Sequence, residues 1–130
     1  MKNLFITFMC LFSSFTILAF EIPSSVCSSV ETIEMISNIE LQRYNSGLVS
    51  EVKKSEVNFI MNRLLEEYDR ALDLAETNVE VALLETVAED LKFDLESLSF
   101  GDNQLAVNGA VETYKSANEK AHLMVDYFCK

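Results

Sequence analysis

The feature that most constrains this chain is its shortage of residues that break helices. The 130 residues include 3 Gly and 1 Pro, and neither type occurs between Leu48 and Phe100. An all-β domain needs a turn, commonly marked by Gly or Pro, about every 8–12 residues. Because 49% of the residues are hydrophobic and 24% are charged, the composition also excludes a disordered chain. The sequence therefore predicts a single small all-α domain.

Apolar residues recur at helical spacing in four stretches of the chain, and no stretch alternates apolar and polar residues for long enough to predict a strand. We expect helices near residues 25–45, 49–76, 79–98 and 104–129. Ser24 or Ser25 can cap the first helix, and Gly47 can end it in the left-handed conformation. Gly101 and Asp102 predict a turn before the fourth helix.

The boundary between the second and third helices needs a separate argument, because composition alone would allow one long helix. At 100° per residue, the apolar stripe around Leu91 lies opposite the stripe around Leu64. A continuous helix would therefore turn its two apolar stripes in opposite directions. We predict a break near Thr77 and Asn78, with Thr77 and Glu80 forming a capping box. The alternative is a long two-faced helix used in an oligomer.

The N-terminus has the layout of a cleaved secretory signal peptide. Lys2 supplies a positive start, residues 4–12 are apolar except for Thr7, and Ala19 is a small residue suited to cleavage. A membrane anchor is the alternative, but it needs about 20 strongly apolar residues, and hydroxyl and amide side chains interrupt this stretch. We expect a signal peptide at residues 1–19, a mature domain at residues 20–130, secretion or periplasmic export, and no stable membrane anchor.

Cleavage would remove Cys10 and leave Cys27 and Cys129 near the two ends of the mature chain. An even number of cysteines in an oxidising compartment favours a disulfide, so we predict a bond between Cys27 and Cys129. Short connections make neighbouring helices antiparallel, which predicts an up-down-up-down four-helix bundle. That topology places both cysteines at the same end. We expect a monomer; free thiols or a disulfide between two chains are the alternatives.

Few residues are suited to catalysis or metal binding. The only His, His122, forms a Glu-x-x-His pair with Glu119, as in iron-binding bundles. We expect Glu119 on the solvent side, and the chain has no second His to complete such a site. Among the carboxylates of the second helix, only Glu67 is a candidate to face the core. We therefore predict no enzyme activity, no metal site and no cofactor.

The charge pattern says more about function than the candidate catalytic and metal-binding residues do. The formal net charge is −11, with 10 Lys and Arg against 21 Asp and Glu, which disfavours nucleic-acid binding. The spacing i, i+3, i+7, i+10 places four acids on one side of the second helix. We call these four residues the acidic ribbon: Glu66, Asp69, Asp73 and Glu76. We expect ion pairs between Glu66 and Arg70 and between Glu89 and Lys92, which leave most of the acidic charge unpaired.

The acidic ribbon predicts a docking face for a basic protein partner, and the protein would act by non-catalytic binding, as an inhibitor or adaptor does. An acidic surface that only keeps the protein soluble is the simpler interpretation. A carrier of a small hydrophobic ligand is the alternative function. Its cavity would be lined by aromatic and methionine side chains, unless these simply form the core: Phe59, Met61, Tyr68, Phe93, Phe100, Tyr114, Met124, Tyr127 and Phe128.

Overall fold

The computed structural model describes residues 25–47, 49–98 and 104–130, which form four helices and two short strands. In chain order these are α1 (Val26–Asn45), β1 (Val52–Lys53), α2 (Lys54–Leu74), α3 (Asn78–Ser97), β2 (Gln104–Leu105) and α4 (Val107–Phe128). The predicted all-α class with four helices is confirmed. The signal peptide expected at residues 1–19 and the turn expected at Gly101 and Asp102 lie outside the described residues.

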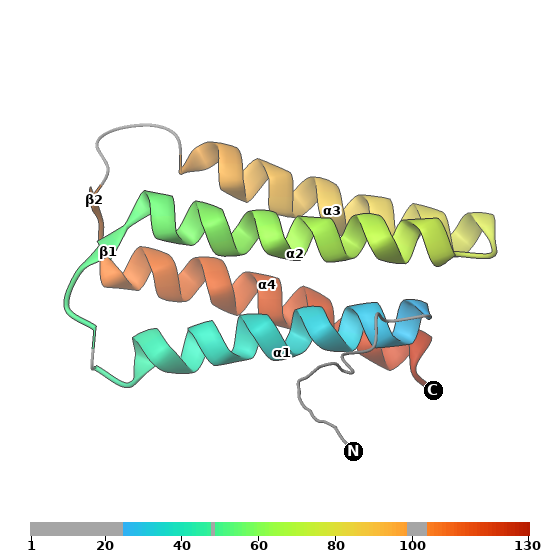
Figure 1. The fold of residues 1–130 in the computed structure, drawn as a ribbon, viewed down its shortest axis with the longest axis horizontal. Helices are drawn as coiled ribbons and strands as arrows, with labels where there is room; N and C mark the ends of the chain where they lie inside the picture. The colour runs from blue at the N-terminus through green and yellow to red at the C-terminus, as the bar shows by residue number, and fades with distance from the viewer. Residues whose placement is uncertain (1–24, 48, 99–103) are drawn as a thin grey trace, which may run out of the picture.

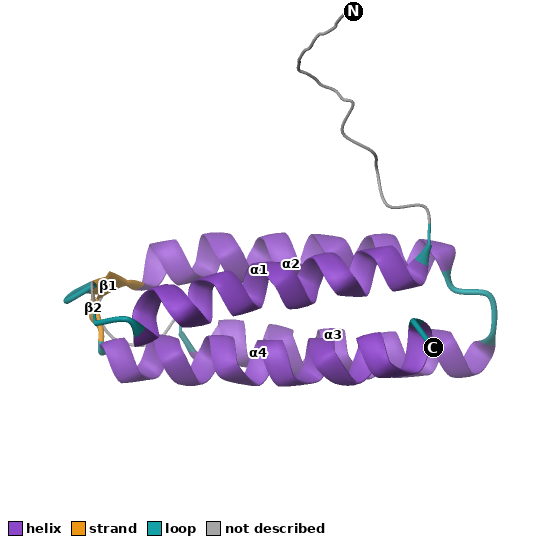
Figure 2. Cartoon of the chain, turned by 90° about the horizontal axis from the view of Figure 1, so that it is seen from below, coloured by secondary structure: helices purple, strands orange, loops and turns teal. Residues whose placement is uncertain are grey.

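Successive helices run in opposite directions, so the order is up-down-up-down (Figure 1). Seen at right angles to this view, the helices form two layers, α1 with α2 and α3 with α4 (Figure 2). Each helix packs on its neighbours in the chain, and α4 completes the bundle by packing along α1. The contact between α1 and α4 is the most extensive of these, and the contact between α3 and α4 is the smallest.

The core lies between the helices and receives side chains from all four of them. On α2, the buried residues Val57, Met61, Leu64, Tyr68 and Ala71 have the spacing of one helical stripe. Side chains that are fully buried in the other elements include Val30, Ile33, Val52, Leu84, Leu91, Tyr114, Ala117 and Ala121. The apolar stripes seen in the sequence are therefore the faces that pack together.

The predicted break between the second and third helices exists. α2 ends at Leu74, and Thr77 caps α3, because its side-chain oxygen accepts a hydrogen bond from the Glu80 N–H at 3.1 Å. Glu80 Oε1 accepts a hydrogen bond from the Glu76 N–H at 2.8 Å, one residue earlier than in a standard capping box. The chain reversal lets both apolar stripes face one core. A single long helix across this point is therefore excluded.

The opposite end of the bundle differs from the prediction. The second helix begins at Lys54 instead of near residue 49, and the fourth begins at Val107 instead of near residue 104. Between them, Val52 pairs with Leu105 and Lys53 with Gln104 in an antiparallel ladder. A ladder of two residues is too short to produce an alternating pattern in the sequence, so the prediction of no strand is wrong here. The end of α1 agrees with the prediction, since Gly47 has a φ of 81°.

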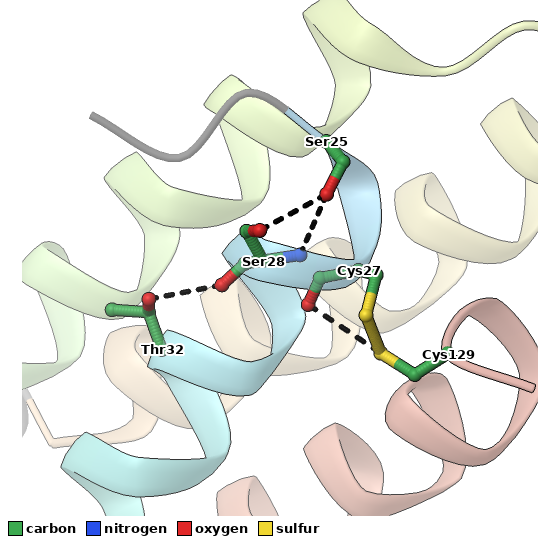
Figure 3. Close-up of a disulfide and its surroundings, with 5 residues drawn as sticks. All are labelled: Ser25, Cys27, Ser28, Thr32 and Cys129. Atoms are coloured by element: carbon green, nitrogen blue, oxygen red, sulfur yellow. Dashed lines mark hydrogen bonds between the residues drawn. A yellow bond between two sulfur atoms is a disulfide. The ribbon is translucent and has the colours of Figure 1, made fainter. Parts of the chain in front are cut away.

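The predicted disulfide between Cys27 and Cys129 is confirmed, with 5.0 Å between the two Cα atoms. It joins the start of α1 to the residue that follows α4 (Figure 3). Nearby, Ser25 caps α1 by accepting a hydrogen bond from the Ser28 N–H at 3.1 Å. Ser24, the other candidate cap, lies outside the described residues. None of the described helices has the length and apolar character needed to cross a membrane.

Candidate functional site

The structure places the four residues of the acidic ribbon on the surface of α2 and at its C-terminal end. Glu66, Asp69, Asp73 and Glu76 are all exposed. At 100° per residue the directions of Glu66, Asp69 and Asp73 fall within about 60° of one another, on the side of α2 away from the buried stripe. Glu76 lies two residues beyond the end of α2, which stops before the predicted residue 76, so helical spacing does not place it on this strip.

No basic side chain in the described part of the chain forms an ion pair with a carboxylate of the ribbon. The expected pair between Glu66 and Arg70 is wrong. Arg70 Nη1 instead lies 2.6 Å from Glu67 Oε2, and Arg63 Nη2 lies 3.8 Å from the same oxygen. The two arginines of α2 therefore both turn away from the ribbon and toward Glu67.

Glu67 is buried, as the sequence indicated it could be, with an exposed fraction of 3%. Its attraction for the arginines is stronger than that of an exposed carboxylate, because burial lowers the local dielectric constant. The other carboxylate oxygen, Oε1, has no hydrogen-bond partner among the described residues. Sequence reasoning missed this cluster, although the spacing of Arg63, Glu67 and Arg70 could have revealed it. Positions i−4 and i+3 both lie beside position i on a helix.

Further acidic residues lie on α3, which packs beside α2 (Figure 1). Exposed acids on this helix are Glu85, Glu89, Asp90 and Glu96. Lys92, the only base on α3, lies 3.6 Å from Glu89, which confirms that expected ion pair. Both side chains are more than half exposed, so the pair contributes little to stability. The acidic ribbon thus borders a second helix with an excess of negative charge.

The side chains proposed to line a ligand cavity do not share one location. Phe59, Phe93 and Tyr127 are exposed by 74%, 69% and 52%, so these three do not line an interior cavity. Most of the remaining ones lie in the core: Met61, Tyr68, Tyr114 and Met124. Phe128 is half-buried against this core, and Phe100 lies outside the described residues. The arrangement supports the core interpretation of these residues more than the carrier interpretation.

His122 connects α4 to α1. Its Nδ1 lies 2.7 Å from Glu34 Oε2 on α1, and its Nε2 lies 3.7 Å from Asp126 Oδ2. The hydrogen bond to Glu34, and then the charge of Asp126, raise the pKa of His122 above its ordinary value of 6.5. Glu119 is exposed, in agreement with its expected solvent position. The Glu-x-x-His pair is therefore part of the surface.

One group of potential metal ligands occurs in the described part of the chain, at the end closed by the disulfide. The group consists of Cys27, Glu31 and Cys129, whose ligand atoms lie within 4.8 Å of one another. Both sulfur atoms are used in the disulfide, and metals bind the thiolate form of cysteine. The group as it stands in the oxidised protein is therefore structural.

No protein family, characterised protein or solved structure matches this chain. The function must therefore be inferred from the surface of the protein. This surface is distinguished by a strip of carboxylates whose nearest arginines pair instead with a buried glutamate.

Proposed function

We propose that this protein is exported and binds a basic protein partner through the acidic ribbon, without catalysing a reaction. An inhibitor or an adaptor acts in this way. One observation carries the proposal: Arg63 and Arg70 are drawn to the buried carboxylate of Glu67, so the four ribbon carboxylates have no ion-pair partner among the described residues. Unpaired charge on one face favours encounters with a partner of opposite sign.

The proposal includes export, with residues 1–19 as a cleaved signal peptide and residues 20–130 as a secreted or periplasmic monomer. A disulfide is compatible with an oxidising compartment, where such bonds form and persist. Solubility is the competing explanation of the acidic surface, because a large net charge of either sign keeps proteins dispersed. The two explanations differ in whether the position of the charges matters.

The test begins with capture of the partner from the native compartment, followed by association kinetics at several salt concentrations. We expect the association rate to fall steeply as salt rises, because salt screens long-range attraction. Neutralising the ribbon with Glu66→Gln, Asp69→Asn, Asp73→Asn and Glu76→Gln should lower the rate by about tenfold or more and leave the fold intact. An association rate that does not change with salt would contradict the proposal.

A matched control separates position from net charge. Four acids that are exposed elsewhere on the molecule are changed together to Gln: Glu31, Glu51, Glu112 and Glu119. This variant has the same net charge as the neutralised ribbon variant. We expect it to retain most of the association rate. If both variants lose the rate equally, the ribbon is not a docking face and only the net charge matters.

A further inference from the structure

An open groove of about 370 Å³ is lined by residues from the end of α1 and the start of α2. Both helix ends lie at the end of the bundle that carries β1 and β2 (Figure 1). The lining of the groove includes Glu40, Arg43, Tyr44, Glu56, Phe59 and Ile60. None of these residues belongs to the acidic ribbon. The groove combines carboxylates, aromatic rings and an aliphatic side chain within the volume of a small molecule.

The charges in the groove do not balance. Arg43 Nη1 lies 3.4 Å from Glu40 Oε1 and 3.3 Å from the Tyr44 hydroxyl, and its guanidinium lies 5.1 Å from the centre of the Tyr44 ring. The only cation of the lining is therefore engaged with Glu40. Glu56 is exposed in the first turn of α2 and forms no ion pair among the described residues. Electrostatic interaction with Tyr44 first, and then with Glu40 and Glu56, raises the pKa of Arg43. The lining, with two carboxylates and one guanidinium, has an excess of one negative charge.

Tyr44 of the lining stacks on a buried tyrosine that does not itself line the groove. Tyr114 of α4 is fully buried and stacks on Tyr44, with 5.7 Å between ring centres and 9° between ring planes. Its hydroxyl has no hydrogen-bond partner among the described residues. Burial first, and then the charge of Glu40, raise the pKa of Tyr114 above its ordinary value. The ring stack fixes the position of the Tyr44 ring in the wall of the groove.

We propose that the groove binds a small organic cation, an ammonium or guanidinium group joined to an apolar body. The cation pairs with Glu56, and the apolar body covers Phe59 and Ile60. Phe59 is 74% exposed, so its ring is available both for apolar contact and for a cation–π interaction. The same chemical group occurs in free amines and in the Lys and Arg side chains of proteins. This site is separate from the docking face proposed above.

The binding test uses NMR titration of the isotopically labelled, oxidised protein in two arms. The first arm adds phenethylammonium chloride, and the second adds a tripeptide of Leu, Arg and Leu with blocked termini. We expect at least one probe to give saturable shifts of the amide signals of Tyr44, Ser55, Glu56 and Phe59. Saturation by the amine identifies free amines as the source, and saturation by the peptide alone identifies a protein side chain.

Two variants locate the site, and a third is the control. Glu56→Gln and Phe59→Ser should each weaken binding about tenfold, because each removes one of the two main contacts. Glu119→Gln changes an exposed glutamate of α4 that belongs to neither proposed site, and it should change the affinity by less than about twofold. Absence of saturation in both arms would overturn the proposal. An equal loss in Glu56→Gln and Glu119→Gln would also overturn it, because attraction would then be diffuse. Neither result bears on the acidic ribbon.

Discussion

A single buried carboxylate, Glu67, determines where the two arginines of α2 lie. Glu67 is 3% exposed, while the side chains of its partners Arg63 and Arg70 are 48% and 41% exposed. The guanidinium groups therefore reach inward from the surface to a charge in the core. A buried carboxylate must be paired, since its ionised form is costly to remove from water. Because Arg63 and Arg70 both pair with Glu67, neither of them pairs with a carboxylate of the acidic ribbon.

The two arginines should contribute unequally to stability. Arg70→Ala removes the contact of 2.6 Å to Glu67, and we expect a loss of about 1–3 kcal/mol of unfolding free energy because the buried carboxylate loses its main partner. Arg63→Ala removes a contact of 3.8 Å, and we expect a loss of less than about 1 kcal/mol. Urea unfolding measures both values. Equal losses would show that the arginines share the carboxylate.

The hydrogen bond between His122 and Glu34 predicts a dependence on pH. A pKa raised in the folded protein means that folding favours the protonated imidazole. This stabilisation is fully present below the unfolded pKa of about 6.5 and is lost as the pH rises through the higher folded pKa. NMR titration should show a lower pKa for His122 in Glu34→Gln than in the original protein. The chain has 1 His, so its ring signals are unambiguous. An identical pKa in both proteins would contradict the prediction.

At the level of elements, the connection between α2 and α3 determines how the acidic charges are distributed. The chain turns at residues 75–77, and Thr77 and Glu80 satisfy backbone N–H groups there. Because α3 then packs back along α2, its acidic residues are on a helix next to α2 instead of continuing away from it. The cap therefore affects the candidate docking face as well as the fold.

The N-cap of α3 can be tested directly. Thr77→Ala removes the acceptor for the Glu80 N–H, and we expect a loss of about 1 kcal/mol of unfolding free energy. Thr86→Ala is the control, because the same substitution is made on the same helix at an exposed position outside the cap. Thr86 donates only to the Ala82 carbonyl, and Ala is a better helix former, so its effect should be close to zero. Similar losses in both variants would show that the loss is not specific to the cap.

At the scale of the whole molecule, the contact between the first and last helices closes the bundle. α1 and α4 form the most extensive helix pair, and the disulfide joins residues 102 positions apart at one end of that pair. The pair also includes the His122–Glu34 hydrogen bond and the stacked rings of Tyr44 and Tyr114. Stability therefore depends on contacts between the first and last helices.

Removal of the disulfide tests both the fold and the proposed monomer. On the chain-entropy argument a bond across such a loop stabilises by about 4–5 kcal/mol, and we expect Cys27→Ser with Cys129→Ser to lose about 2–5 kcal/mol. The original protein should run as a monomer on non-reducing gels, and reductant should destabilise it without affecting the double variant. A disulfide-linked dimer, or two thiols that can be alkylated in the native protein, would contradict this prediction.

The sequence by itself determined the four helices, the break at Thr77 and the disulfide, because each depends on local spacing or on residue type. Helical periodicity repeats every few residues, a cap acts over one turn, and only two cysteines remain beyond the expected signal peptide. The exposed positions of Glu66, Asp69 and Asp73 on one side of α2 have the same origin. Exposed carboxylates at these spacings need no tertiary contact to lie together.

Only the tertiary structure decided which groups from distant or competing positions meet. Arg70 has a glutamate both three and four positions earlier, and the burial of Glu67, which depends on the neighbouring helices, selects one of them. The pairing of β1 with β2 joins segments about 50 residues apart, and the contact of His122 with Glu34 joins the first and last helices. Such contacts depend on how the helices pack, and helical periodicity carries no information about them.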